Sequence, residues 1–155
     1  MELKTKVTAE EGKQEILITR VFDLPADLVF RAHTEPELVE QWMGNKVKKM
    51  ENRDHGSYEF EVRDNEGNVL MHANGCIHKI TENQSIIRTF EMDSAGFPVQ
   101  LEFLEFEPVS DEQSKLSIRM VYRSVSDRDN MLKLPFVQGI NMAHSQLEKI
   151  IGKHK

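Results

Sequence analysis

Cysteine is almost absent from this sequence. A single residue, Cys76, stands in a chain of 155, so an internal disulfide, a CxxC motif and a zinc ribbon are all excluded. A chain without disulfides suits a reducing compartment. A chain of this length buries roughly 70% of the surface that its unfolded form exposes, which is enough for one domain to fold without covalent links.

Long apolar runs are also missing. No stretch approaches the roughly 20 apolar residues that cross a bilayer. The opening residues, MELKTKVTAEEGKQEILITR, contain no apolar segment of signal-peptide length. We therefore expect a cytoplasmic protein without a membrane span.

An excess of positive charge is missing as well. The formal net charge is −6 and the isoelectric point is about 5.5, whereas nucleic-acid binders usually carry a basic footprint. The one basic cluster is Lys46, Lys48 and Lys49, and its alternation with Val47 is typical of the solvated face of a strand. We expect no nucleic-acid partner.

The familiar catalytic and cofactor motifs are not found. The sequence has no GxSxG nucleophile elbow, no GxxxxGK(S/T) phosphate loop and no GxGxxG dinucleotide fingerprint. Its six histidines do not form an HExxH pair, and a zinc site needs three or four converging ligands. We predict no catalytic residues, no cofactor and no metal site.

The individual histidines have ordinary interpretations. His72 and His78 share the parity of one predicted strand but would lie about 20 Å apart, too far to share a metal ion. His144 lies one helical turn before Glu148, which predicts a surface pair. His55 and His154 are expected in a turn and in the tail.

The order of the predicted elements indicates one α+β domain over residues 1–155. A β-rich run predicts a first strand over 13–22. Pro25 marks the start of a short helix, and a second short helix follows and ends at Gly44. Turn residues at the spacing of a meander separate six further strands, which we place at 46–52, 57–63, 68–80, 84–92, 98–107 and 114–122.

Period-two alternation identifies the inner face of two of these strands. The apolar members are expected to point toward the C-terminal helix: Tyr58, Phe60, Leu116, Ile118 and Met120. Their polar neighbours are expected to face water, as an antiparallel sheet allows: Glu59, Glu61, Ser117 and Arg119. Gly75 leaves the register of its strand open, because a glycine there can mark a bulge.

The end of the chain predicts a helix that restarts at Pro135, after a short piece whose start at 126–129 resembles a capping box. Apolar residues recur along one helical stripe: Phe136, Ile140, Ala143, Leu147 and Ile150. The large apolar surface that can cover this stripe is the inner face of the sheet. The resulting architecture is a helix-grip fold, a curved antiparallel sheet of about seven strands packed on a long C-terminal helix.

Such a fold often keeps an apolar pocket with few polar groups between sheet and helix. Eight methionines suit adaptable filling of that space, although they are equally expected as ordinary core or surface residues. Trp42, the single tryptophan, closes the second short helix. It is predicted to pack that helix pair against the sheet edge, to stack on a ligand, or both.

Residues 22–32 read FDLPADLVFRA, followed by TEPEL at 34–38 and QW at 41–42. This block resembles the start of an activator of heat-shock protein 90 ATPase homologue-like domain, a family of the START and birch-pollen-allergen (SRPBCC) superfamily. GSYEF at 56–60, NGCIHKI at 74–80, RDNML at 128–132 and the stretch 138–147 are similar to later parts of that family. The resemblance covers residues 13–151. It implies a small-molecule cavity in many members, and contact with a chaperone or another protein in a few.

Three positions depart from the family pattern. His33 stands where an aromatic residue is common, Met43 where a second tryptophan is common, and His55 where a second glycine is common. The first two would change the shape and polarity of a pocket, so the resemblance assigns no ligand.

The residues expected to line the pocket are Phe30, Trp42, Met43, Tyr58, Phe60, Arg88, Phe90, Leu104, Met120, Tyr122, Phe136, Ile140 and Ala143. Of these, Tyr58 and Tyr122 would orient polar groups of a ligand. An outward direction is favoured for Arg88 because arginine is mostly exposed. If Arg88 faces inward, it needs an acidic partner or a ligand carboxylate or phenolate.

The leading hypothesis is a non-enzymatic domain, monomeric or weakly dimeric, that binds a planar apolar molecule, polyketide- or flavonoid-like, or a lipid. A protein-interaction domain, for example a chaperone cofactor, would instead expose an apolar patch of several hundred Å² outside the cavity. An enzyme that cyclises or hydrolyses its substrate would need an inward charged cluster, for which Arg88 with His72 or His78 is the candidate. The acidic run of Glu102, Glu105 and Glu107 is mostly expected to face water rather than to act as acid and base.

Overall fold

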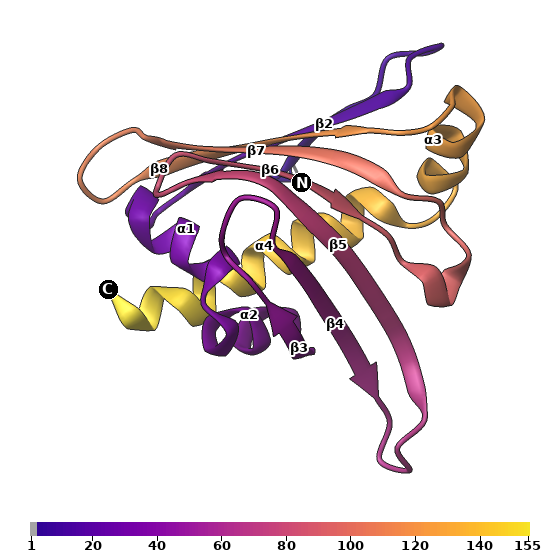
Figure 1. The fold of residues 1–155 in the computed structure, drawn as a ribbon. Helices are drawn as coiled ribbons and strands as arrows, with labels where there is room; N and C mark the ends of the chain where they lie inside the picture. The colour runs from indigo at the N-terminus through magenta and orange to yellow at the C-terminus, as the bar shows by residue number, and fades with distance from the viewer. Residues whose placement is uncertain (1–2) are drawn as a thin grey trace.

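The computed structural model describes residues 3–155, and their strands form one antiparallel sheet in the order β1-β2-β8-β7-β6-β5-β4-β3 (Figure 1). The strands are β1 Lys6–Thr8, β2 Glu15–Phe22, β3 Lys46–Met50, β4 Ser57–Arg63, β5 Val69–Thr81, β6 Ser85–Phe90, β7 Gln100–Pro108 and β8 Ser114–Val121. The predicted strands are all present with small shifts at their ends. β1 is additional: it pairs with β2, with Val7 opposite Ile18, and three residues are too short to show an alternation.

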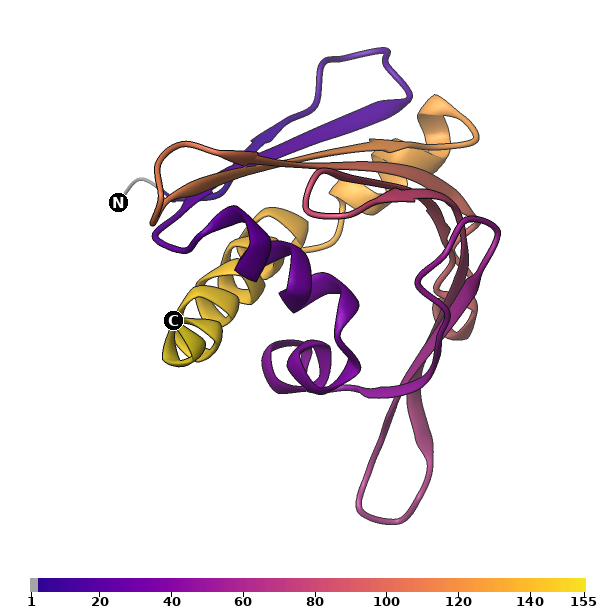
Figure 2. The ribbon, with the colours of Figure 1, turned by 60° about the vertical axis from the view of Figure 1, so that its left-hand side comes forward.

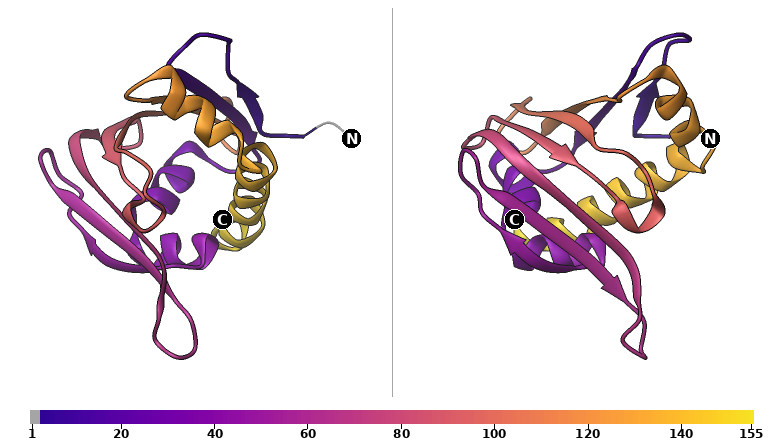
Figure 3. Two further views of the ribbon diagram at one scale, coloured as in Figure 1. Left: turned by 90° about the vertical axis from the view of Figure 1, so that its right-hand side faces the viewer. Right: turned by 45° about the vertical axis from the view of Figure 1, so that its right-hand side comes forward.

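The helices α1 Ala26–Thr34 and α2 Pro36–Met43 follow β2, while the helices α3 Val125–Leu132 and α4 Phe136–Ile151 follow β8. Three of them, α1, α2 and α4, lie on the concave side of this sheet, and α3 lies at the end of its strands (Figure 1, Figure 2). Figure 2 and the left panel of Figure 3 show the sheet curving around α1, α2 and α4. The α+β helix-grip prediction is therefore confirmed. Within residues 3–155 no helix is long and apolar enough to cross a membrane.

The capping box of α3 was predicted two residues too late. The cap is Ser124, whose side chain accepts a hydrogen bond from the backbone N–H of Asp127 at 3.1 Å. Ser124 and Asp127 have the same spacing as the predicted pair Ser126 and Asp129, so the spacing alone does not decide between them.

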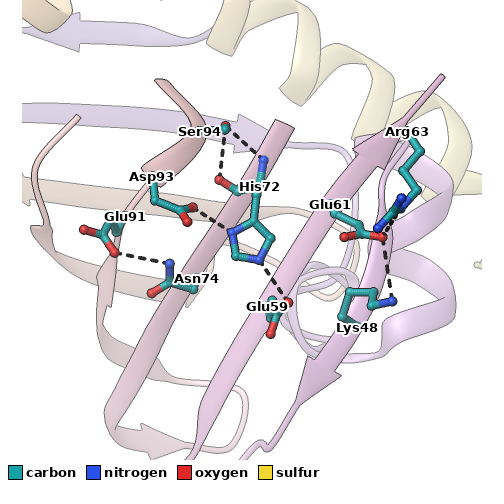
Figure 4. A network of polar contacts seen from close by, with 9 residues as sticks. All are labelled: Lys48, Glu59, Glu61, Arg63, His72, Asn74, Glu91, Asp93 and Ser94. Atoms are coloured by element: carbon teal, nitrogen blue, oxygen red, sulfur yellow. Dashed lines mark hydrogen bonds and ion pairs between the residues drawn. The ribbon is translucent and has the colours of Figure 1, made fainter. Parts of the chain in front are cut away.

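The predicted inner face of β4 and β8 is confirmed, because Tyr58, Phe60, Leu116, Ile118 and Met120 are all buried. One of their polar neighbours departs from the prediction. Glu61 does not face open water and is only 5% exposed, since Arg63 Nε lies 2.6 Å and Lys48 Nζ 3.7 Å from its Oε1 (Figure 4). The alternation predicts on which face of the sheet a side chain lies, but it does not predict how far neighbouring side chains bury it.

The register around Gly75 is regular. Gly75 pairs with Tyr58, and the two register shifts of this strand lie away from it, one between Val69 and Met71 and the other between Ile77 and Lys79. A Cβ at position 75 would lie 2.0 Å from the carbonyl oxygen of Thr89 and 2.5 Å from the Tyr58 hydroxyl. The glycine is therefore explained by the close approach of the Tyr58 ring rather than by a bulge.

The C-terminal helix is buried along a different line from the predicted stripe. His144, Leu147 and Ile151 are buried, whereas Phe136, Ile140, Ala143 and Ile150 are only half-buried. The C-terminal half of α4 packs into the core, while its N-terminal half borders a cavity that is described below. The prediction that the stripe is mostly buried is therefore wrong, because only Leu147 of its five residues is buried.

The docking of α4 generates a stability prediction. Leu147→Ala removes a side chain with 0% exposure and should lower the free energy of unfolding by about 2–5 kcal/mol. Met142→Ala, on the same helix at 70% exposure, should change it by less than about 0.5 kcal/mol. Urea titration followed by circular dichroism measures both, and equal losses would contradict this placement of the helix.

Candidate functional site

A cavity of about 270 Å³ lies between the concave face of the sheet, the helix pair α1 and α2, and the N-terminal half of α4. Its wall is mostly apolar, with a few polar side chains from separate elements. The lining residues are His33, Val39, Trp42, Met43, Phe60, Arg88, Phe90, Met92, Gln100, Glu102, Leu104, Ile118, Met120, Met131, Phe136, Ile140 and His144.

Most of the residues expected to line a pocket lie around this cavity: Trp42, Met43, Phe60, Arg88, Phe90, Leu104, Met120, Phe136 and Ile140. Four lie elsewhere. Phe30 packs edge-on against Phe106 in the core, with ring centroids 5.3 Å apart. Ala143 borders an open apolar groove beside α4.

Tyr58 and Tyr122 also lie outside the cavity wall. The Tyr58 hydroxyl donates to the backbone carbonyl of Thr89 at 2.5 Å, and the Tyr122 hydroxyl lies 3.6 Å from Met120 Sδ. Burial raises the pKa of both tyrosines, so both are neutral near pH 7. Whether any of the predicted residues binds a ligand stays a prediction.

Arg88 faces inward and has an acidic partner, contrary to the favoured outward prediction. It stands opposite Glu102 on the neighbouring strand, and its Nε donates to Glu102 Oε1 at 3.0 Å. Gln100 Nε2 donates to the other oxygen, Oε2, at 2.8 Å. The guanidinium carbon lies 5.1 Å from the centroid of the Tyr58 ring. This polar group therefore forms one wall of the cavity.

The inward direction of Glu102 was missed for a specific reason. β7 carries apolar residues of both parities, Leu101 and Phe103 on one face, and Leu104 and Phe106 on the other. A strand with apolar residues on both faces does not reveal its inner side by alternation. Glu105 and Glu107 are exposed as expected.

The pKa of Arg88 reflects this environment. Burial works against its charge, but the neighbouring Tyr58 and Glu102 outweigh burial and raise the pKa. Arginine is already protonated at all ordinary pH values. The cavity wall thus holds a permanent cation beside a carboxylate that balances it.

Two histidines lie in the cavity wall at its α1 and α4 side, and their roles were not predicted. His33 Nδ1 lies 2.8 Å from the carbonyl oxygen of Val29. His144 Nδ1 lies 3.1 Å from Thr5 Oγ1. His144 is 1% exposed, so the predicted surface pair with Glu148 is wrong, and Glu148 lies instead 3.6 Å from Arg20.

Burial keeps both of these rings neutral. It lowers the pKa of His33 to about 4, an effect that the bond to Val29 opposes and the charge of Arg88 reinforces. It lowers the pKa of His144 to about 3, reinforced by charges on His33 and Arg20. An imidazole with so low a pKa is a weak proton acceptor at pH 7. The site suits hydrogen bonding better than proton abstraction.

Trp42 joins the helix pair to the cavity. Its indole Nε1 donates to the carbonyl of Ala32 at 2.7 Å, and its ring lies 5.4 Å from that of His33. The structural role and contact with the cavity therefore occur together. Met43, at 41% exposure, lies next to it in the cavity wall.

His72 and His78 do not join Arg88. Both alternate with the inward residues Ala73, Gly75 and Ile77. His72 Nδ1 contacts Asp93 at 2.7 Å and its Nε2 contacts Glu59 at 2.9 Å, while Ser94 Oγ accepts from its backbone N–H (Figure 4). The charged cluster nominated for catalysis therefore does not form, and His72 instead ties the turn after β6, which carries Met92 of the cavity wall, to β5.

The Arg88–Glu102 pair generates a prediction about stability. Glu102→Leu leaves a buried cation without its counter-charge and should cost about 3 kcal/mol. The double variant Arg88→Met with Glu102→Leu should recover most of that loss, because an apolar pair of similar volume replaces the ions. Glu105→Leu, on the outer face of the same strand, is the control. Urea titration checks all three, and a double variant no more stable than Glu102→Leu would contradict the pairing.

His72 generates a prediction about pH. Hydrogen bonds that the His72 ring donates to Glu59 and to Asp93 raise its pKa above the ordinary 6.5. Its stabilising effect is therefore complete below pH 6.5 and is lost as pH rises through the folded-state pKa. His72→Gln should therefore lose up to about 1 kcal/mol relative to wild type at about pH 5.5 and less at about pH 8.5. The neighbouring Glu61 is already paired with Arg63.

The control for this pH series is His78→Gln, on the same strand. Its stability difference from wild type should not follow the pH profile of His72→Gln, because no carboxylate is within bonding distance of His78 among the described residues. Chemical denaturation at several pH values measures the difference. A loss for His72→Gln that grows with pH would contradict the pairing in Figure 4.

Known proteins share this architecture. A family model described as Activator of Hsp90 ATPase homolog 1-like protein matches residues 23–152, and a search of curated proteins gives no match. Solved structures with the same fold include a protein from Rhodobacter sphaeroides, at 16% identity and TM-score 0.84 over 96% of this chain and 99% of the other.

A protein from Mycobacterium smegmatis is similar at 17% identity and TM-score 0.81, over 94% and 95% of the two chains. A protein from Arthrobacter aurescens is similar at 14% identity and TM-score 0.83, over 96% of this chain and 91% of the other. At these identities the likeness shows the fold alone. Since the family model spans most of the sequence, the chain belongs to the Activator of Hsp90 ATPase homolog 1-like family.

Proposed function

We propose that this chain is a binding domain that holds a small, flat, mostly apolar molecule in the cavity between its sheet and α4. The observation that supports this most is the cavity itself. It is walled mainly by aliphatic, aromatic and methionine side chains, with a few polar groups that converge from α1, α4, β6 and β7. That combination is typical of small-molecule sites.

The size of the cavity favours a compact ligand. Its volume of about 270 Å³ lies just below the range of about 300–1,000 Å³ for drug-sized ligands. Two or three fused or linked rings match this volume better than a lipid with a long acyl chain. The methionines at positions 43, 92, 120 and 131 give the wall side chains that adapt to a ring at little cost.

The charges in the wall favour a neutral ligand. Glu102 balances Arg88 at 3.0 Å, and both histidines are uncharged near pH 7 because burial lowers their pKa values to about 4 and about 3. An ionised ligand would have to leave water without an unpaired opposite charge to meet it.

A second candidate, docking of another protein, draws support from the apolar groove along α4, lined by Leu134, Pro135, Phe136, Gly139, Ile140 and Ala143. Phe136 and Ile140 belong both to this groove and to the cavity wall. The groove is therefore explained more simply as the approach to the cavity. A chaperone partner, a weak homodimer and a cytoplasmic location stay predictions.

The test uses Trp42, which lines the cavity. Flavone and 2-naphthol should change its fluorescence and raise the melting temperature by about 5 °C or more at 100 times the dissociation constant, where binding adds about 2.7 kcal/mol. Palmitate, a long-chain lipid, should have a smaller effect. An unchanged ligand after long incubation is expected for a binding domain, whereas depletion would indicate an enzyme.

A matched pair of variants locates the binding. Ile140→Phe adds bulk to the cavity wall and should reduce the thermal shift, because the side chain and the ligand compete for the same space. Met142→Phe makes a similar change on the exposed side of α4 and should leave the shift unchanged. The proposal fails if neither planar probe binds, or if both variants bind as wild type does.

A further inference from the structure

The polar atoms in the cavity wall differ in whether they already have partners. The Trp42 N–H donates to Ala32. Both oxygens of Glu102 accept hydrogen bonds, one from Arg88 and one from Gln100. The Nδ1 atoms of His33 and His144 are also occupied. Among residues 3–155, no hydrogen-bond partner contacts the Nε2 atom of either histidine.

The tautomer of His33 follows from its partner. A carbonyl oxygen only accepts hydrogen bonds, so the contact with Val29 at 2.8 Å requires the proton on Nδ1. In a neutral imidazole the other nitrogen is then a bare acceptor. His33 therefore presents a lone pair at Nε2.

The tautomer of His144 follows from a chain of three residues. Arg20 Nη1 only donates, and it donates to Thr5 Oγ1 at 3.1 Å. The Thr5 oxygen could accept a second hydrogen bond, but its own proton would then be a buried donor without an acceptor. Donation to His144 Nδ1 at 3.1 Å, the other contact of that oxygen among residues 3–155, avoids this cost. Nδ1 of His144 is thus an acceptor, and the neutral ring carries its proton on Nε2. His144 therefore presents a donor.

The two rings therefore differ in hydrogen bonding. His33 on α1 offers an acceptor at Nε2, and His144 on α4 offers a donor at Nε2. His33 lies near the end of α1 and His144 in the middle of α4, and both line the cavity. α1 and α4 are in contact, and a charge on His33 would lower the pKa of His144. Apolar rings complete their surroundings, with Phe106 5.4 Å from His33 and Phe22 5.5 Å from His144.

We propose that His33 and His144 together bind a hydroxyl group of the ligand, which donates to Nε2 of His33 and accepts from Nε2–H of His144. This inference rests on the proposed function and names the ligand class, a flat apolar molecule that carries an un-ionised phenol or alcohol. An ether lacks the proton that His33 accepts. A carboxylate would meet the lone pair of His33, and its charge would have no free counter-charge there.

Three naphthalenes test the inference on the folded protein. By isothermal titration calorimetry, 2-naphthol should bind wild type about tenfold more tightly than 2-methoxynaphthalene or naphthalene, as expected for about one net hydrogen bond. The preference should be flat between about pH 5.5 and about pH 8, since both histidines stay neutral there. A preference that rises with pH would indicate binding of the phenolate by Arg88 and would overturn the inference.

A pair of variants separates recognition from space. His33→Phe should still bind naphthalene but should lose the preference for 2-naphthol. Phe60→Leu, elsewhere in the wall, should weaken all three probes and keep their ratio. If wild type binds the three equally, the hydroxyl inference fails while the proposed binding function stands. If none binds, the proposed function fails as well.

A spectroscopic measurement does not depend on whether a variant folds. In ¹⁵N-labelled wild type, long-range ¹H–¹⁵N spectra should show His33 protonated at Nδ1 and His144 protonated at Nε2. Adding 2-naphthol should shift these two Nε2 resonances, and adding 2-methoxynaphthalene should shift them less. The opposite tautomers, or equal shifts from both probes, would overturn the inference.

Discussion

The packing of the C-terminal half of α4 is the contact on which the site depends. Leu147 and Ile151 have no exposed surface, and they fix one end of the helix in the core. At the other end of the helix, Phe136 and Ile140 line the cavity instead of packing against the sheet. Unfilled space forfeits dispersion contacts. The eight-stranded sheet and the continuous hydrophobic core supply the stabilising contacts that compensate for those missing at the cavity.

The same geometry explains the polar interior. Arg20 and Arg88 both point inward from the sheet, and each has a carboxylate nearby, Glu148 at 3.6 Å and Glu102 at 3.0 Å. Each cation also disfavours a charge on a nearby histidine, Arg20 on His144 and Arg88 on His33. Positive charge is thus held in two balanced pairs, and the imidazoles between them remain neutral.

The parts of this structure that the sequence predicted are those with a clean local period. β8 alternates strictly, and its inner residues were identified. β7 has apolar residues on both faces, so its acidic run was mostly expected to face water and the inward member, Glu102, was not identified although it shares the parity of Leu104. On α4, the apolar stripe places Ile150 inside, but the buried line runs through His144 and Ile151. That small rotation is set by the sheet and the helix pair, which a local pattern does not contain.

His33 illustrates why a site is harder to predict than a fold. Its position was recognised as a departure that changes the polarity of a pocket, yet nothing in the neighbouring sequence shows that its Nδ1 meets the carbonyl of Val29. His144 resembles a surface residue one turn from Glu148 until Thr5, Arg20 and Phe22 are brought against it. Each tautomer is fixed by partners that only the folded chain assembles. Within a fold shared at 14–17% identity, such partners, rather than the scaffold, decide which hydrogen-bonding atoms the cavity wall presents.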